Sequence, residues 1–152
     1  MTNDEVIAFL KVHLQSIQEN DIQTYHETTA DDLTLYEWWV TPHRLDGLPF
    51  HDFMMAENAR RGSVFGAPDI QTLESDRPRT RYDLANLRIQ HYGDCAIASY
   101  TLLTSTSAGQ GVQVNAHNES RVMVKINGAW KVVHVHKSPA WPAPHTQPLK
   151  PG

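Results

Sequence analysis

Cysteine is nearly absent from this sequence, which has a single one, Cys95, in 152 residues. One thiol cannot form an internal disulfide, so the fold must hold without covalent cross-links. A chain of this length can bury enough surface for one stable domain without them. Cys95 lies inside an apolar run, so we expect a buried small hydrophobic residue in a reducing or indifferent compartment.

Long hydrophobic runs and an excess of positive charge are also missing. No stretch approaches the length of a membrane span, and the N-terminus shows no signal-peptide pattern. Lys and Arg number 13 against 17 Asp and Glu, a formal net charge of −4, whereas a nucleic-acid-binding face is basic. The sequence therefore predicts a cytoplasmic protein with neither nucleic acid nor membrane among its partners.

The start of the chain carries helical signals. Thr2 and Glu5 have the spacing of a capping box. The apolar residues that follow at helical spacing, and that predict an amphipathic helix ending near residue 20, are Ile7, Leu10, Leu14 and Ile17. Asp21 can cap a second, shorter helix that reaches about residue 25.

The next part of the chain changes type twice. Residues 33–39 are rich in strand-forming side chains. A third helix is expected to begin at Pro49, which suits a first helical turn, and to end at Gly62. Residues 62–80 show no sustained period and predict a long loop.

The second half of the chain favours β structure. The stretches with strand character, which we expect to form an antiparallel meander, are 82–92, 95–106, 112–126 and 129–138. The last two flank Asn127-Gly128, a strong hairpin signal. Helices followed by a meander define an α+β fold, with a curved antiparallel sheet covering the N-terminal helices. We expect one domain over 1–138 and an extended proline-rich tail over 139–152.

Three segments of the sequence resemble one known family: LDGLPFHDFMMAEN, GDCAIASYTLLT and, most specifically, NESRVMVKINGAWKVVHVHKSPAWPAP. The last is similar to a family hairpin that opens on Glu-Thr-Arg-Val, continues through Gly-x-Trp and closes on His-x-His. The family is the association domain of calcium/calmodulin-dependent protein kinase II with its stand-alone bacterial relatives, within the nuclear transport factor 2-like superfamily. The resemblance covers about residues 4–144.

This resemblance implies a cone of curved sheet wrapped around helices, with a deep pocket and subunits joined into dimers or larger rings. It also implies that a histidine and several arginines line the pocket and hold a small carboxylate. His51 matches the histidine, Arg121 the hairpin arginine, and Lys137 the arginine after His-x-His. Leu102 stands where the family has a further arginine, so one positive group is missing. We count Tyr100 as a fourth ligand-binding residue.

The two cations of the hairpin point to the same site independently. Arg121 shares a strand face with Met123, and Lys137 shares one with Val133 and Val135, which indicates the core-facing side. Pairing about the Asn-Gly turn places Arg121 roughly opposite His134. Because buried cations need an anionic partner, an anion is expected between them, either a ligand or an internal carboxylate. In the alternative without a ligand, His51 only caps its helix, Lys137 points to solvent, and the internal partner of Arg121 is Glu119, Asp83 or Glu37.

The opposite face of the last strand has a second pattern. The residues expected to point away from the core are Trp130, Val132, His134 and His136. Such a row is apolar enough to need covering, which predicts at least a symmetric homodimer. The two histidines have a spacing that can hold one metal ion. A third ligand could be His117 or His91, but no sequence motif identifies it. We predict no metal and no cofactor.

Two functions remain open from the sequence. The favoured one is a self-associating protein without kinase activity of its own, with a cationic pocket for a small anion. The rival is a SnoaL-like isomerase, dehydratase or cyclase, which would need a base and an acid near a carbonyl substrate. Its acid and base candidates are His51, Asp83, Tyr36, Tyr82 and Tyr100. No motif selects a catalytic pair, so this rival rests on fold-level analogy.

Overall fold

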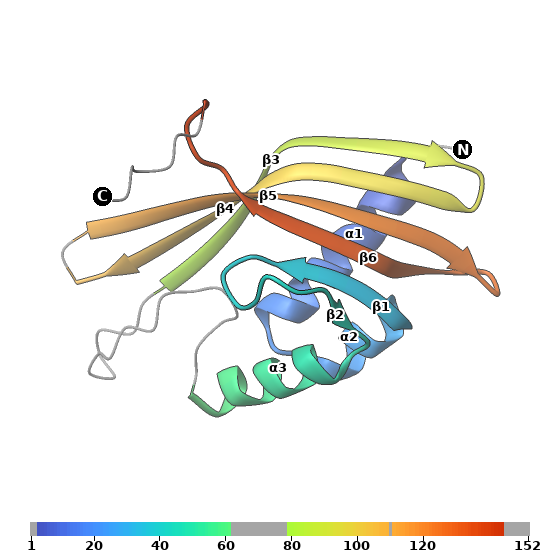
Figure 1. Ribbon diagram of the computed structural model, residues 1–152, viewed down its shortest axis with the longest axis horizontal. Helices are drawn as coiled ribbons and strands as arrows, with labels where there is room; N and C mark the ends of the chain where they lie inside the picture. Colours follow the sequence, from blue (N-terminus) through green and yellow to red (C-terminus); the bar gives the residue numbers. More distant parts are fainter. Residues whose placement is uncertain (1–2, 62–78, 110, 145–152) are drawn as a thin grey trace, which may run out of the picture.

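A computed structural model describes residues 3–61, 79–109 and 111–144 of the chain. Its helices, which lie together on one side of a curved sheet (Figure 1), are α1 (Asp4–Gln18), α2 (Ile22–Thr28) and α3 (Pro49–Arg61). Its strands are β1 (Thr29–Glu37), β2 (Leu45–Asp46), β3 (Arg79–Tyr92), β4 (Cys95–Ala108), β5 (Gly111–Ile126) and β6 (Ala129–Pro139). The order across the sheet is β2-β1-β6-β5-β4-β3. The expected α+β class is confirmed.

The ends of the helices follow local signals in most places. Asp21 caps α2 by accepting a hydrogen bond from the Thr24 backbone N–H at 3.2 Å, and α3 begins at Pro49, as expected. The N-cap of α1 is Asn3, whose side chain makes no capping hydrogen bond. The expected capping role of Thr2 lies outside the described residues, as does most of the loop predicted over 62–80.

The sheet contains one pairing that the sequence did not indicate. Strands β3 to β6 form the expected antiparallel meander, closed by the Asn127-Gly128 turn. Strand β1 adds to its edge by pairing parallel with β6, and Glu37 lies opposite Lys137. The strand expected over 33–39 therefore begins earlier, at Thr29, and ends at Glu37.

The core lies between α1 and the inner face of the sheet. Helix α1 buries Val6, Leu10 and Leu14 at helical spacing, and the sheet buries Met123 and Val132 against them. Residues three and four apart on a helix share one face, so a single stripe of α1 supplies this packing. The described helices include none that is long and apolar enough to cross a membrane.

A β-bulge in strand β6 changes which side chains face the core. Met123 pairs with Val132, but the next residue, Val122, pairs with His134, so Val133 is an extra residue. Side chains alternate along a strand, and an extra residue restarts that alternation. The predicted outward row is consequently wrong for Trp130 and Val132, whose side chains are buried, and right for His134 and His136, which point outward. For the same reason Arg121 lies opposite Val135, not His134.

Cys95 is also placed differently from the prediction. It is partly exposed at the start of β4, because the alternation of that strand directs Ala96 and Ala98 to the core instead.

Candidate functional site

Four polar side chains form a continuous row across the inner face of the sheet. Glu37 on β1 lies opposite Lys137 on β6, Lys137 lies opposite Glu119 on β5, and Glu119 lies opposite Tyr100 on β4. All four residues are buried. We call Glu37, Lys137, Glu119 and Tyr100 the polar row. Directly opposed residues on neighbouring strands share a face, so strand pairing alone brings these groups together.

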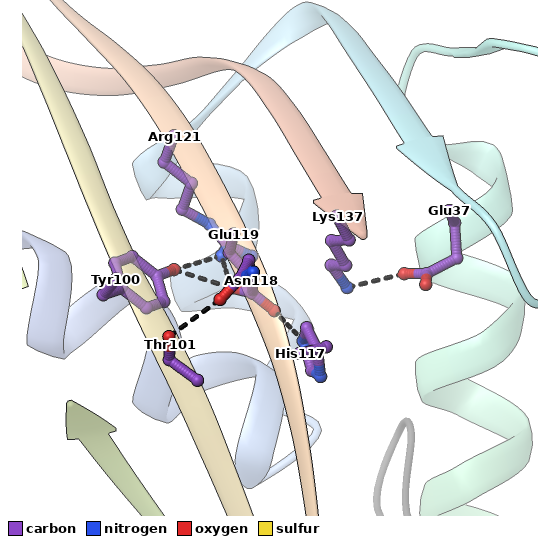
Figure 2. Close-up of polar contacts among 8 residues, drawn as sticks. All are labelled: Glu37, Tyr100, Thr101, His117, Asn118, Glu119, Arg121 and Lys137. Atoms are coloured by element: carbon purple, nitrogen blue, oxygen red, sulfur yellow. Dashed lines mark hydrogen bonds and ion pairs between the residues drawn. The ribbon is translucent and has the colours of Figure 1, made fainter. Parts of the chain in front are cut away.

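Arg121 joins the polar row from the next inward position of β5. Its Nη1 group forms an ion pair with Glu119 Oε1 and also donates to the Tyr100 hydroxyl. The Tyr100 hydroxyl in turn donates to Glu119 Oε1 at 2.6 Å. The other carboxylate oxygen of Glu119 contacts Nε2 of His117. Figure 2 shows Arg121, Tyr100 and His117 converging on Glu119, so both oxygens of this carboxylate are held.

The charges around Glu119 keep it ionised. Burial alone raises the pKa of this carboxyl group, but Arg121, the hydrogen bond from His117 and nearby Lys137 outweigh burial and hold the pKa well below its usual range. Burial also raises the pKa of Tyr100, so its phenol stays neutral and can donate. The arrangement is a buried carboxylate with a full set of donors.

Lys137 has a carboxylate of its own. Its Nζ lies 2.7 Å from Glu37 Oε2, and Figure 2 shows the lysine directed toward this residue. Arg121 and Lys137 are thus matched by Glu119 and Glu37. The anion expected beside these cations was either a ligand or an internal carboxylate. Among the described residues, internal carboxylates fill this role. The third candidate, Asp83, pairs instead with Arg81 at the surface.

A small cavity of about 50 Å³ opens beside this network. Its polar wall contains His117, Glu119, Arg121 and Lys137, and its apolar wall includes Leu14 and Leu102. A water molecule occupies about 30 Å³ in the liquid, so the space suits one or two waters or a small polar group. The cavity brings two predicted ligand residues, Arg121 and Lys137, to one wall.

A wider groove of about 440 Å³ adjoins this cavity between α1 and the strands β3 and β4. Leu14, Gln18, Tyr82 and Leu102 line both spaces, which makes the groove a path from solvent to the polar wall. Two residues that line the cavity carry a buried donor without a hydrogen-bond partner among the described residues: the Tyr82 hydroxyl and Arg121 Nε. Unpaired buried donors favour an acceptor from outside.

The other two predicted ligand residues lie behind the cavity wall. Tyr100 supports Glu119 and Arg121, as described above. His51 is buried in α3, where its Nδ1 contacts the hydroxyl of Tyr25. Burial, reinforced by the positive charges of Lys137 and Arg121, lowers the pKa of His51 well below its usual value, so the imidazole is neutral.

The outward histidines of β6 make local contacts. His134 Nδ1 lies 2.6 Å from the Thr34 hydroxyl, and His136 packs against the ring of Tyr36. Of the nominated third ligands, His117 is held by Glu119, and His91 Nε2 donates to the backbone carbonyl of Gly93. Within the described residues, no group of three or more His, Cys, Asp or Glu side chains is arranged to hold a metal ion.

His117 is a polar cavity residue that sequence reasoning did not assign to this site. The signal was present, because His117, Glu119 and Arg121 alternate along one strand and must share its inner face. The sequence alone did not show that β1 supplies Glu37 as the partner of Lys137.

The curved sheet, the helices packed on its inner face and the polar cavity between them define an α+β domain of the nuclear transport factor 2-like fold. A superfamily protein from Salmonella enterica aligns with a TM-score of 0.65 and 18% identity, covering 93% of this chain and 92% of that one. Residues 2–141 match the family model of the calcium/calmodulin dependent protein kinase II association domain. The chain belongs to this family.

Individual relatives agree with the family assignment. The hub homology domain of Chlamydomonas reinhardtii aligns with a TM-score of 0.71 and 25% identity, covering 90% of this chain and 97% of that one. The delta subunit of the type II kinase from Oryctolagus cuniculus is 27% identical over 149 residues, which are 97% of this chain. The chain spans only 25% of the length of that kinase.

Proposed function

We propose that this protein is a self-associating domain. The observation that carries the proposal is the match to an association domain over residues 2–141. The surface supports it, because β1 is followed by three consecutive exposed apolar residues, Trp38, Trp39 and Val40. Exposed apolar patches of this kind are typical of protein interfaces.

Sedimentation velocity across a range of micromolar concentrations tests self-association directly. We expect a species at least twice the 17.2 kDa mass of the chain, because the family assignment and the exposed apolar surface both favour assembly. A single monomeric species up to about 100 μM, far above a typical interface affinity, would contradict the proposal.

We propose further that the cavity binds a small carboxylate or a similar anion. The observation that supports this is the pair of unpartnered buried donors, Tyr82 Oη and Arg121 Nε, beside a cavity that a groove connects to solvent. Because Arg121 and Lys137 already have carboxylate partners, the site is not strongly cationic overall. Hydrogen bonds from these two donors, more than net charge, would therefore select the ligand.

Substitution of Tyr82 by phenylalanine separates binding from folding. The hydroxyl has no partner among the described residues, so its loss should leave the Tm unchanged or slightly higher. One hydrogen bond to a ligand is worth about 0.5–1.5 kcal/mol, so carboxylate affinity should fall about 2- to 12-fold. The measurement is calorimetric titration with acetate and butyrate. Tyr92→Phe, at a residue 65% exposed, is the matched control. Equal affinities in Tyr82→Phe and wild type would count against the pocket.

The enzymatic alternative has one specific contact to consider. His51 has a lowered pKa and contacts a tyrosine, Tyr25, but the two meet in the core, while the cavity is walled by other residues. A catalytic pair should face each other across the space that holds the substrate. We therefore propose no reaction.

A further inference from the structure

Strand β5 is longer than its neighbour β6. Strand β6 ends at Pro139, which lies opposite His117. The first six residues of β5, Gly111–Ala116, therefore have β4 on one side and no strand on the other among the described residues (Figure 1). We call Gly111–Ala116 the β5 overhang. Pro142 and Pro144 follow Pro139 in the chain. Neither has the backbone N–H that a strand needs to continue the pairing.

The register of β5 shows which backbone groups of the overhang are available. Near the other end of the strand, the Lys125 N–H donates toward β4, to the carbonyl of Asp94 at 2.7 Å. The β4·β5 register is unbroken along both strands. Odd-numbered residues of β5 therefore direct their backbone groups to β4, and even-numbered residues direct theirs to the other side. In the overhang, Val112, Val114 and Ala116 point their N–H and C=O groups toward the open side.

The outermost strands of the sheet are protected against pairing, whereas the overhang is not. Strand β2 is only two residues long. Strand β3 carries the Arg81–Asp83 ion pair and a bulge between Ala85 and Arg88. Short length, charge and bulges are the usual defences of a sheet edge. The overhang, GVQVNA, has no charge, no proline and no bulge, and its valines at 112 and 114 are 67% and 57% exposed.

We propose that the β5 overhang pairs antiparallel with the overhang of a second copy of this chain, about a twofold axis at Val114. This proposal rests on the self-association proposed above and names its surface. Opposed residues in such a pair share a face, so Val114 meets Val114 and Val112 meets Ala116. In this register the outward backbone groups of Val112, Val114 and Ala116 all form hydrogen bonds. No other register pairs more backbone groups of the overhang.

The composition of the overhang favours a second copy over a different partner. An uncharged strand meets its own copy without like-charge repulsion, which a charged edge such as β3 would suffer. The apolar residues of the overhang oppose apolar residues in this register, and the amides Gln113 and Asn115 oppose each other on the inner face. The strand is therefore complementary to itself.

Disulfide trapping tests the geometry. In the proposed pair the two Val114 Cα atoms lie about 5.5 Å apart, the spacing of a hydrogen-bonded antiparallel pair and within the range that a disulfide spans. Val114→Cys, in a full-length Cys95→Ser background, should form a covalent dimer under mild oxidation. Tyr92→Cys in the same background is the control, because Tyr92 is 65% exposed at the far end of β3. It should stay uncross-linked.

A charge at the axis tests the contribution to affinity. Val114→Lys places two like charges opposite each other, and we expect the dimer dissociation constant to rise by at least about tenfold. Val12→Lys makes the same change at a residue 50% exposed on α1 and should leave the constant unchanged. Circular dichroism spectra should match wild type for both variants, because both sites are exposed.

The outcomes separate this proposal from the one on which it rests. Trapping of Val114→Cys together with weakening by Val114→Lys supports edge pairing. A wild-type oligomer with neither effect overturns edge pairing and leaves self-association standing. A wild-type monomer up to about 100 μM overturns both, since tighter constants than this are usual for specific interfaces.

Discussion

Replacing Arg121 with methionine is expected to lower the free energy of unfolding by about 3–5 kcal/mol. The substitution keeps most of the apolar stem but removes the guanidinium that pairs with Glu119. Both side chains are almost fully buried, at 1% and 2% exposure, so little water can replace the guanidinium at the carboxylate. Removal of one partner of a buried ion pair is costly because the other loses its main compensating charge. Urea denaturation followed by circular dichroism measures the change.

A control and a double variant make this result specific. Arg81→Met breaks the exposed pair with Asp83, whose arginine is 79% exposed, and should cost less than about 1 kcal/mol. Adding Glu119→Gln to Arg121→Met removes the stranded charge and should recover a substantial part of the loss. If Arg121→Met and Arg81→Met cost the same, the buried network has no special role in stability.

Stability is expected to rise with pH between about 5.5 and 7.5, by up to about 2.7 kcal/mol from two buried groups. Two buried histidines carry this effect. Burial lowers the pKa of His13 and of His51 well below 6.5, and the positive charges of Arg121 and Lys137 lower both further. Below about pH 6.5 these two imidazoles bind protons in the unfolded chain but stay neutral in the folded chain. The stabilisation is therefore present above that pH and is lost as the pH falls. Urea denaturation at several pH values measures the slope.

Substitution of one histidine at a time shows which residue causes the pH dependence of the free energy of unfolding. His13→Asn and His51→Asn should each remove about half of it, since each residue contributes about 1.4 kcal/mol per pH unit at most. His43→Asn, at an exposed residue, is the matched control for the loss of an imidazole, and the slopes of the buried variants are compared with its slope. An unchanged slope in both buried variants would show that these imidazoles do not govern the response to acid.

Much of the fold could be predicted because its signals are local. Asn127 and Gly128 both adopt positive φ angles, 51° and 82°, which is the conformation that an Asn-Gly hairpin requires. Pro49 and Asp21 mark helix starts through their own chemistry, a fixed φ angle and a side-chain acceptor. The parallel pairing of β1 with β6 joins residues about a hundred positions apart, and no local pattern encodes it.

The site could be predicted only in part, for the same reason. Alternation along β5 was enough to place Arg121 inside, and Glu119 was already one of its candidate partners. The partner of Lys137 depends on β1 lying beside β6, so Glu37 could be named only as one carboxylate among several. His51 was expected beside the cations, but its first contact is Tyr25, because the orientation of α3 follows from packing between helices.

The extra residue in β6 acts as a phase shift between two halves of one strand. The half next to the turn contributes Trp130 and Val132 to the core, and the far half contributes Val135 and Lys137. In a strand of strict alternation these two sets would face opposite sides, so only one of them could be inside. Val133 therefore lets a hydrophobic core and a charged cavity be built on the same face of the same strand, each with its own spacing.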